Sequence, residues 1–372
     1  MLTVLTDSGY HSQFLIPDGV DARIVRRRFL KRYRVLSPFA IHAPAPGYDL
    51  LHTQNLIPLT TKPWVVSFES VLPRTLAGPR WVQTFLRMQL MRDNCKALVA
   101  MSDWAVLQFR ATSADWRGFE QVSKKTIVMH PTVPLRCQER RRFKRGDILE
   151  LVFVGRNFAG KGGLASLRAA RKLKTLGVPV RFHIVSSMQF GPGVFPDAPI
   201  RAPYEAELVC PPDNVVFYGE MPNADVLSLM KHSHFTLLPT LHDTFGFSVI
   251  EGYSVGTPAI TSNVCALPEF VTEGKTGMVL SLPLDERRRV PIVACWPHYG
   301  WDEVDPLYDC LSKQLVESIL RVIESPSIVE TMSDGAIRQV EGQRARATTF
   351  LDRLYQDAVG NSSNHRRVKT GD

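Results

Sequence analysis

The chain has 372 residues, of which 44% are hydrophobic and 22% charged, as in soluble globular proteins long enough for two domains. No apolar run approaches the ~20 residues that span a bilayer, so a transmembrane protein is not expected. The residues from Met1 to Asp7 lack a basic start and read as a first strand, not as a secretion signal. The six cysteines form no Cys-x-x-Cys pair, which argues against a metal or disulfide framework and for a reducing cytoplasm.

The net charge of +9 comes largely from two basic runs, at residues 23–34 and 136–145. Such clusters attract nucleic acid, anionic lipid or anionic substrates alike, and a solvated surface is the plain alternative. The first run includes apolar residues such as Ile24, Phe29 and Tyr33, which suit a membrane interface. Since no recognised nucleic-acid motif accompanies the two runs, a nucleic-acid partner is not expected.

The first half of the chain alternates apolar runs with helical segments, which predicts a parallel α/β sheet. Pro79 suits the start of a helix over residues 79–94. Glu69, His52 and His130 stand at the ends of apolar runs, and each is either a cleft residue or a structural polar residue. The strands are expected at residues 2–5, 49–52, 64–68, 97–101 and 126–129.

The second half repeats this alternation after a polar, basic segment at residues 136–147, which we interpret as an interdomain linker. Residues 186–203 are rich in glycine and proline and predict an irregular excursion, and the polar segment 283–305 predicts an insertion. The strands are expected at residues 149–154, 180–185, 215–219 and 235–238. The helices are expected at residues 164–176, 306–323, 329–340 and 344–359, with a disordered tail from residue 361.

The loop after the strand at residues 149–154 carries two cations. Gly155 relaxes the backbone as the strand ends, and Arg156 and Lys161 follow, five residues apart. Arginine offers a planar fork and lysine a point charge, and both suit a diphosphate. The loop is not a P-loop, because no Gly-Lys-Ser/Thr sequence stands at the required spacing. On its own such a loop is common, so a purely structural role stays open.

A strand, a polar loop and a helix start follow one another within residues 235–251. Ligands of open α/β sheets bind outside the carboxyl ends of the strands, and a helix starting near Gly246 would direct N–H groups at a phosphate there. Asp243 in the loop and Glu251 about a turn into the helix can then face one ligand. Such carboxylates would accept hydrogen bonds from sugar or ribose hydroxyls, or would merely stabilise the helix start.

The segment from Asp243 to Glu251 resembles the acidic signature of retaining GT-B glycosyltransferases, especially of glycosyltransferase family 4. It has the pattern of an acid, seven residues and a glutamate around a Phe-Gly-Phe core. Residues 252–262, 267–271 and 274–277 resemble the helix, tight turn, strand, next helix start and turn that follow in the family. The first acid is usually glutamate in the family, so the carboxylate here is one methylene shorter.

The resemblance implies a donor site for a nucleotide-diphosphate sugar. Arg156 and Lys161 would hold the phosphates and neutralise the leaving group. Glu251 would hold the ribose hydroxyls, and Asp243 the hydroxyls of the donor sugar. A metal or another cofactor is not expected, because the two cations can neutralise the diphosphate and an Asp-x-Asp motif is lacking. The other expected donor contacts come from Gly155, Phe245, Gly246, Phe247 and the hydroxyl of Ser248.

The nucleobase and acceptor sites are less fully defined by the sequence. By the resemblance, the base would lie near the ends of strands 182–185 and 215–219, with Glu220 as a candidate neighbour, and the nucleotide stays open. Glu69 stands where family members often carry a histidine, and it would act as a general base or simply bind acceptor hydroxyls. Retaining transfer in the family is generally thought to give the acceptor proton to the departing phosphate, so no protein nucleophile is assigned.

The resemblance thus predicts an α/β protein with two Rossmann-like domains facing a cleft, the GT-B fold. The acceptor-side domain would cover residues 1–146, and the nucleotide-sugar domain residues 147–340. A helix at residues 341–360 would cross back to the first domain, as it does in the family, before a tail at residues 361–372.

The predicted activity is a hexosyltransferase-like, metal-independent transfer of a sugar, with retention, from a nucleotide-diphosphate sugar to an acceptor hydroxyl. The basic N-terminal run points to an anionic membrane surface, and to a lipid-linked or polysaccharide acceptor in envelope or exopolysaccharide synthesis. The expected location is the cytoplasm, including the inner face of the membrane. Two alternatives stay open: a nucleotide-sugar epimerase of the same fold, and a nucleotide-sugar-binding protein with a degenerate catalytic site.

Overall fold

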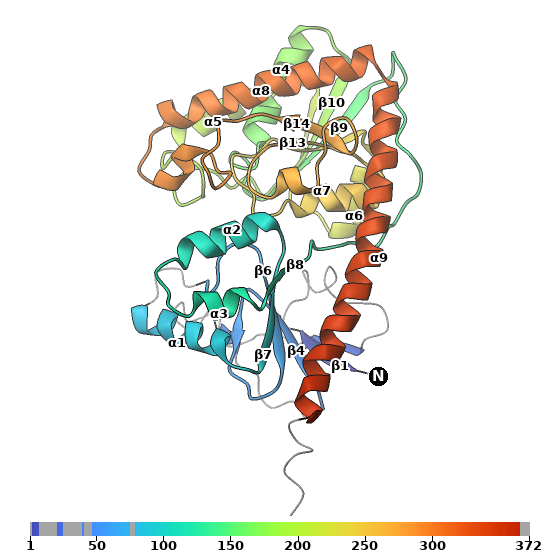
Figure 1. Ribbon diagram of the computed structural model, residues 1–372. Coiled ribbons are helices and arrows are strands. Elements are labelled where there is room, and N and C mark those ends of the chain that lie inside the picture. Colours follow the sequence, from blue (N-terminus) through green and yellow to red (C-terminus); the bar gives the residue numbers. More distant parts are fainter. Residues whose placement is uncertain (1, 7–20, 25–38, 41–46, 75–78, 365–372) are drawn as a thin grey trace, which may run out of the picture. The chain divides into compact units, whose positions relative to one another are not determined.

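A computed structural model describes residues 2–6, 21–24, 39–40, 47–74 and 79–364 of the chain (Figure 1). By its internal contacts the chain divides into a first unit, residues 1–132 with 343–372, and a second unit, residues 133–342. Residues 25–34 of the first basic run and residues 365–372 of the tail lie outside the described part. Within that part, no helix is long and apolar enough to cross a membrane.

The strands of the first unit confirm the predicted parallel α/β class. They are β1 (Thr3–Thr6), β2 (Asp21–Ile24), β3 (Phe39–Ala40), β4 (Leu50–Gln54), β5 (Ile57–Pro58), β6 (Trp64–Phe68), β7 (Cys95–Ala100) and β8 (Thr126–Val128). The main sheet has the order β2-β1-β4-β6-β7-β8, and each neighbouring pair is parallel. The short strands β3 and β5 form a separate parallel pair, which the sequence did not predict.

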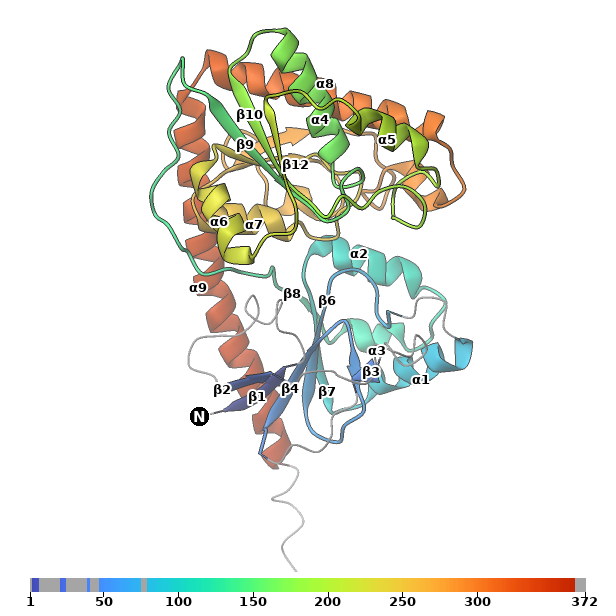
Figure 2. The ribbon, with the colours of Figure 1, turned by 180° about the vertical axis from the view of Figure 1, so that it is seen from behind.

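Helices cover one face of this sheet (Figures 1 and 2). They are α1 (Arg80–Met91), α2 (Asp103–Thr112) and α3 (Phe119–Ser123). The buried side chains of α1 recur at Val82, Leu86 and Leu90, the spacing of one helical face, and belong to the same core cluster as Val66 and Leu98 of the sheet. The helix predicted at residues 79–94 is therefore confirmed as an amphipathic helix on the sheet.

Helix α9 (Ser327–Asn364) is continuous through both units, and its residues from 343 onward belong to the first unit. The sequence predicts two helices here, at residues 329–340 and 344–359. The segment Glu341-Gly342-Gln343 does not separate them, because it contains neither a proline nor a capping side chain. In the first unit, the buried residues of α9 follow a helical period and are Ala347, Leu351, Tyr355 and Ala358.

The second unit contains a further parallel sheet, so the prediction of two Rossmann-like units is confirmed. Its strands are β9 (Leu149–Val154), β10 (Val180–Val185), β11 (Val215–Tyr218), β12 (Phe235–Leu238), β13 (Ala259–Ser262) and β14 (Gly277–Leu280). The order is β11-β10-β9-β12-β13-β14. The central strands β9 and β12 are almost wholly buried, as apolar strands covered on both faces are.

The helices of the second unit cover both faces of its sheet. They are α4 (Gly163–Thr175), α5 (Ala202–Leu208), α6 (Asn223–His232), α7 (Phe247–Ser254) and α8 (Trp301–Glu324). Helices α4 and α8 lie on one face, and α6 and α7 on the other (Figures 1 and 2). Helix α8 begins at Trp301 and not at the predicted Pro306, because the Glu303 carboxylate accepts a hydrogen bond from Gly300 N (2.7 Å) and caps an earlier start.

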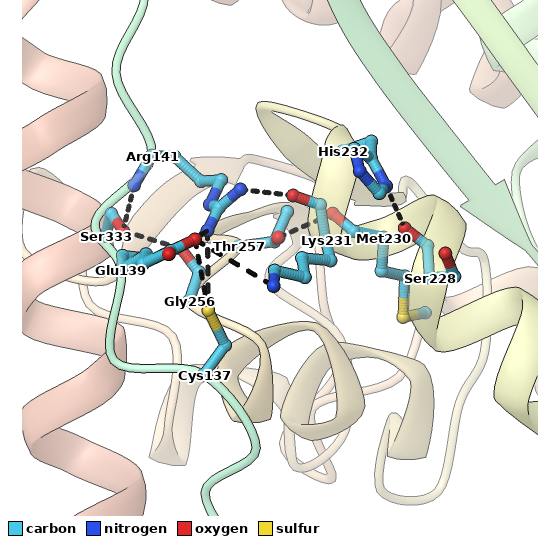
Figure 3. A network of polar contacts seen from close by, with 10 residues as sticks. All are labelled: Cys137, Glu139, Arg141, Ser228, Met230, Lys231, His232, Gly256, Thr257 and Ser333. Atoms are coloured by element: carbon cyan, nitrogen blue, oxygen red, sulfur yellow. Dashed lines mark hydrogen bonds and ion pairs between the residues drawn. The ribbon is translucent and has the colours of Figure 1, made fainter.

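The predicted linker, residues 136–147, lies along the second unit. The amide of Arg136 donates to the carbonyl oxygen of Ser254 at 2.7 Å. The amide of Arg141 donates to Ser333 Oγ at 2.8 Å, and its guanidinium donates to the carbonyl at Lys231 near the end of α6 (Figure 3). Because of these bonds, residues 133–146 belong to the second unit, whereas the predicted first domain extends to residue 146.

Ion pairs occupy much of the second basic run. Arg140 lies 2.8 Å from Asp334, and Arg142 lies 3.2 Å from Glu330, both acids of α9. Acidic side chains of the same unit therefore neutralise part of the positive charge of this run. From the sequence alone, that charge was available to nucleic acid, lipid or solvent. Exposed pairs of this kind contribute little stability, and their main effect here is local neutralisation.

Candidate functional site

Two loops meet at the carboxyl edge of the second sheet, because the strands that precede them, β9 and β12, are neighbours. The Gly160 carbonyl in the first loop accepts hydrogen bonds from Thr240 Oγ1 (2.8 Å) and from Leu241 N (3.0 Å) in the second. The two segments that the sequence analysis singled out separately are thus joined through their backbones.

An ion pair joins the predicted phosphate-binding lysine to the predicted sugar-binding acid. Lys161 Nζ lies 2.8 Å from Asp243 Oδ2 and donates to the His242 carbonyl at 3.1 Å. The side chains of Lys161 and Asp243 are 27% and 15% exposed, so a ligand could still reach both groups. In this partly desolvated setting the pair is stronger than an exposed one.

The other carboxylate oxygen of Asp243 binds the start of helix α7. It accepts hydrogen bonds from Phe245 N (3.1 Å) and Gly246 N (2.7 Å), which an aspartate can reach within its own loop. Burial raises the pKa of Asp243, but Lys161 and these two donors outweigh burial and hold the pKa below its usual range. Two amides expected at the ligand therefore donate to Asp243.

The Phe-Gly-Phe core has a structural part and an accessible part. Phe245 is buried and stacks on Phe270, with ring centroids 5.0 Å apart. Gly246 has a φ of +86°, and a Cβ there would lie 2.5 Å from Leu267 Cδ2, so the turn requires glycine. Phe247 and Ser248 are half-buried in the first turn of α7, where a ligand at the helix start would meet them.

Glu251 lies one turn further along α7 and is buried. Its Oε1 accepts a hydrogen bond from Asn223 Nδ2 at 2.9 Å. Asn223 was not predicted as a site residue, although its place directly after Pro222 at a helix start is a signal in the sequence. The amide holds the Glu251 carboxylate in place from the neighbouring helix α6, which would orient it toward a ribose.

Gly155 and Arg156 differ in their roles. A Cβ at Gly155 would lie 2.9 Å from the Phe153 ring and 3.1 Å from Lys161 Cβ, so glycine allows the loop to close tightly. The Arg156 carbonyl accepts a hydrogen bond from Gln189 N at 3.2 Å, which ties the loop to the segment after β10. The Arg156 side chain is exposed, and among the described residues its guanidinium has no ion pair or hydrogen bond.

His242, next to Asp243, is a half-buried neighbour of the site that was not predicted from the sequence. Burial, with the charge of Lys161, lowers the pKa of His242 to about 4, so its ring is neutral near pH 7. Its Nδ1 lies 3.4 Å from Cys265 Sγ, and its ring packs edge-on to Phe195 at 4.8 Å between centroids. The ring therefore contributes packing and not charge.

The candidate acceptor residues belong to the first unit. Glu69 follows β6, accepts a hydrogen bond from Asn55 Nδ2 (3.1 Å) and forms an ion pair with Arg74. His52 is buried, and both of its ring nitrogens form hydrogen bonds of 2.7 Å, with Tyr355 OH and Ser67 Oγ. Of the two open roles for His52, the structural one is observed.

Two further residues, His130 and Glu220, were predicted from the sequence as candidates near the site. His130, just after β8, is half-buried, and Glu220, just after β11, is exposed. Within the described ranges, no group of three or more His, Cys, Asp or Glu side chains could hold a metal ion. The site is therefore characterised by two cations, two carboxylates and a helix start, all within the second unit.

Two Rossmann-like units, with a cationic loop and an acid-bearing helix start in the second, are the features of the GT-B class. Residues 138–286 match the family described as glycosyl transferases group 1. The match covers the loops that carry Lys161 and Asp243. The family match and the shared fold support a group 1 glycosyltransferase.

Among curated relatives, an uncharacterized 41.2 kDa protein in the cps region of Klebsiella pneumoniae is 31% identical over 91 residues, 24% of this chain and 25% of that protein. The D-inositol 3-phosphate glycosyltransferase of Mycobacterium bovis (strain BCG / Pasteur 1173P2) is 30% identical over 163 residues, 41% of this chain and 32% of that protein. The chain thus spans about a quarter to a third of the length of these relatives.

Solved structures share the fold over nearly the whole chain. A glycosyltransferase from Rickettsia africae ESF-5 has a TM-score of 0.60 and 12% identity, covering 97% of this chain and 99% of that one. WaaG, a glycosyltransferase involved in lipopolysaccharide biosynthesis, has a TM-score of 0.56 and 14% identity, covering 94% and 99%. Anabaena Alr3699/HepE in complex with UDP has a TM-score of 0.57 and 13% identity, covering 96% and 100%.

Proposed function

We propose that this chain is a retaining glycosyltransferase that moves a sugar from a nucleotide-diphosphate sugar to an acceptor hydroxyl. The observation that carries the proposal is the pairing of Lys161 with Asp243 at the carboxyl edge of β9 and β12, inside the segment that matches the family. A diphosphate, a ribose and a sugar each find a suitable group on these loops.

The diphosphate would bind between the two cations. Arg156 extends an exposed guanidinium, and Lys161 supplies a partly buried ammonium. Negative charge develops on the leaving phosphate as the glycosidic bond breaks, and fixed cations in a partly dry site stabilise that charge most strongly in the transition state. Any metal or other cofactor is left out of this proposal, since the chain's own cations can meet the phosphates.

The sugar and the ribose would each meet one carboxylate. Oδ2 of Asp243 binds Lys161, and Oδ1 accepts two amide bonds, which fills about three of roughly four acceptor positions of a carboxylate. One position is left for a hydroxyl of the donor sugar. Glu251, held by Asn223, would accept from the ribose. HepE has been solved in complex with UDP-glucose, which supports a nucleotide-sugar donor for this chain as well.

The donor assignment is tested by calorimetry with UDP, GDP, ADP and their glucose or mannose conjugates. At least one nucleoside diphosphate is expected to bind wild type, and Lys161→Ala is expected to weaken it about 10- to 100-fold, because charge-assisted contacts contribute roughly 1.5–3 kcal/mol. Lys174→Ala is the matched control. Lys174 lies in the last turn of α4, far from the site, and pairs with the exposed Asp213. Wild type that binds none of the panel would contradict the proposal.

Retention and transfer need a second measurement. Proton NMR of the glycoside formed should show the anomeric configuration of the donor. A product of inverted configuration would exclude retention, while donor that epimerises without any acceptor would favour the epimerase alternative. Tight nucleotide binding with no turnover of any donor would favour a binding protein.

We also propose that the first unit docks on an anionic membrane, which would give access to a lipid-linked acceptor. Helix α1 exposes an apolar stripe, with Trp81 67%, Phe85 39% and Met88 57% exposed. The helix contains no acidic residue, and its exposed Arg80 complements anionic headgroups, whereas Arg87 pairs with Asp115. A helix with tryptophan and methionine on an exposed face and arginine beside it suits the bilayer interface.

Co-sedimentation with phosphatidylglycerol-rich vesicles, compared with phosphatidylcholine vesicles, tests this docking surface. Wild type should prefer the anionic vesicles, and the double variant Trp81→Ser, Met88→Ser should lose about 100-fold or more in affinity, since each buried apolar side chain contributes roughly 1.5–3 kcal/mol. Leu176→Ser, at an exposed position of the second unit, is the control. Equal binding of the double variant and of the Leu176→Ser control would exclude α1 as the docking surface.

A further inference from the structure

A buried carboxylate lies where the two irregular segments of the second unit meet. Asp197 belongs to the excursion at residues 186–203, and its side chain is 0% exposed. The insertion at residues 283–305 packs against it: Trp296 Nε1 donates to the Asp197 carbonyl at 3.1 Å, and Tyr299 OH donates to the neighbouring Pro196 carbonyl. The two segments therefore form one cluster.

Donors from separate elements converge on the Asp197 carboxylate. Oδ2 accepts a hydrogen bond from Gly191 N at 3.1 Å, and Oδ1 accepts one from Tyr308 OH of α8 at 3.2 Å. Gly160, in the loop after β9, lies next to this carboxylate, and its N–H favours the ionised form of the carboxyl and lowers its pKa. Burying a carboxylate costs free energy, which hydrogen bonds such as these offset. The same bonds fix the backbone segments that surround the carboxylate.

The element held is Gly160, the residue before Lys161. The N–H of Gly160 faces Asp197, and its carbonyl accepts hydrogen bonds from Thr240 Oγ1 and Leu241 N in the loop of Asp243. A Cβ at Gly160 would lie 2.8 Å from Asp197 Oδ1 and would collide with the Pro196 ring. The backbone from which Lys161 extends is thus fixed on both sides.

The cluster also reaches the second loop of the site. The Phe195 ring packs against His242 at 4.8 Å and against Trp296 at 5.5 Å between centroids. His242 precedes Asp243, and its carbonyl accepts a hydrogen bond from Lys161 Nζ. The excursion at residues 186–203 therefore contacts both loops that carry the Lys161–Asp243 ion pair.

We propose that Asp197 is a positioning residue of the donor site, whose carboxylate fixes Gly160, and with it the backbone that leads into Lys161, so that the Lys161 ammonium meets the diphosphate. This inference rests on the proposed function. The carboxylate is needed because an amide accepts at one oxygen only and would set its own N–H₂ against one of the converging donors.

The test compares Asp197→Asn with wild type by calorimetry at pH 8, where the Asp197 carboxyl is ionised, using whichever of UDP, GDP or ADP binds wild type most tightly, and its nucleoside. The variant should bind the diphosphate about tenfold more weakly, as expected for a displaced charge-assisted contact, while nucleoside affinity changes less than about twofold. Glu150→Gln, the same chemical change at the opposite end of β9, should leave both affinities unchanged. Tyr308→Phe, which removes one donor and keeps the charge, should give a smaller loss of the diphosphate alone.

The outcomes separate the two proposals. Wild type that binds no diphosphate overturns the proposed function and the role of Asp197 with it. Wild type that binds while Asp197→Asn binds equally well overturns the role of Asp197 alone. A parallel loss of nucleoside and diphosphate affinity would show a general structural role and would also overturn positioning. Should Asp197→Asn fail to fold, an unchanged diphosphate affinity in Tyr308→Phe overturns the inference.

Discussion

The ammonium of Lys161 lies 2.8 Å from a carboxylate oxygen of Asp243, in an ion pair that joins the loops after β9 and β12. The same carboxylate holds the turn that precedes α7 through its other oxygen, which accepts from Phe245 N and Gly246 N. A diphosphate at Lys161 therefore has to share or displace the carboxylate. In the proposed donor site, Asp243 would therefore both organise the loops and compete with a phosphate for Lys161.

Asp243→Asn is expected to separate these two effects. Without the competing charge, Lys161 should bind a nucleoside diphosphate about threefold more tightly, since partly exposed ion pairs contribute up to roughly 1 kcal/mol. Turnover should fall about 100-fold, because a misplaced sugar loses its reactive orientation. Calorimetry and initial rates measure the two effects, with Asp213→Asn as an exposed control. Weaker diphosphate binding in the variant would show that Asp243 organises the loop more than it competes.

Gly162→Ala should test how tightly the two loops are packed. Gly162 has a φ of +99°, and a Cβ there would collide with the Pro239 carbonyl of the second loop. We expect a loss of about 2–4 kcal/mol of unfolding free energy, from backbone strain and overpacking together. Gly177→Ala shares the positive φ, at +71°, but faces open space, so it should lose only about 1 kcal/mol. Equal losses in urea titrations would show that the loops yield freely.

The sequence predicts the location of the site better than its internal contacts. Apolar runs that end in glycine, lysine and acid indicate strands with loops at their carboxyl ends, and the loops of Lys161 and Asp243 do meet because β9 and β12 are neighbours. The ion pair between them was not predicted, because strand order is a property of the fold and not of either segment. His52 shows the same limit, since its partner Tyr355 is far away in the sequence.

The irregular segments were the hardest to interpret from the sequence. Residues 186–203 and 283–305 lack periodicity, so their sequence gives no sign that they pack together around Asp197. The segment 136–147 reads as a linker because it is polar and basic. Its arginines instead pair with α9 and bond to α6, contacts that depend on tertiary structure.

His52→Gln should make the first unit less sensitive to acid. Burial lowers the pKa of His52 to about 4 from an unfolded value near 6.5, so below pH 6.5 the unfolded state takes up a proton that the folded state refuses. Wild type should therefore lose up to about 3 kcal/mol relative to the variant as the pH falls from 7 to 4. Hydrogen exchange of residues 343–364 would locate the loss, because His52 bonds to Tyr355. A difference that does not change with pH would contradict the prediction.

Asp197→Asn should show the opposite dependence on pH. Burial raises the pKa of Asp197 to about 7, so between pH 3.8 and 7 the folded state binds a proton that the unfolded state has released. The stability of wild type should then rise relative to the variant as the pH falls from 8 to 4, by up to about 4 kcal/mol. The tyrosines that face the carboxyl, Tyr204, Tyr299 and Tyr308, have pKa values raised by burial and stay neutral throughout this range. Urea titrations at several pH values measure the difference. A difference that stays constant would mean that the donors around Asp197 keep its carboxyl ionised across the range.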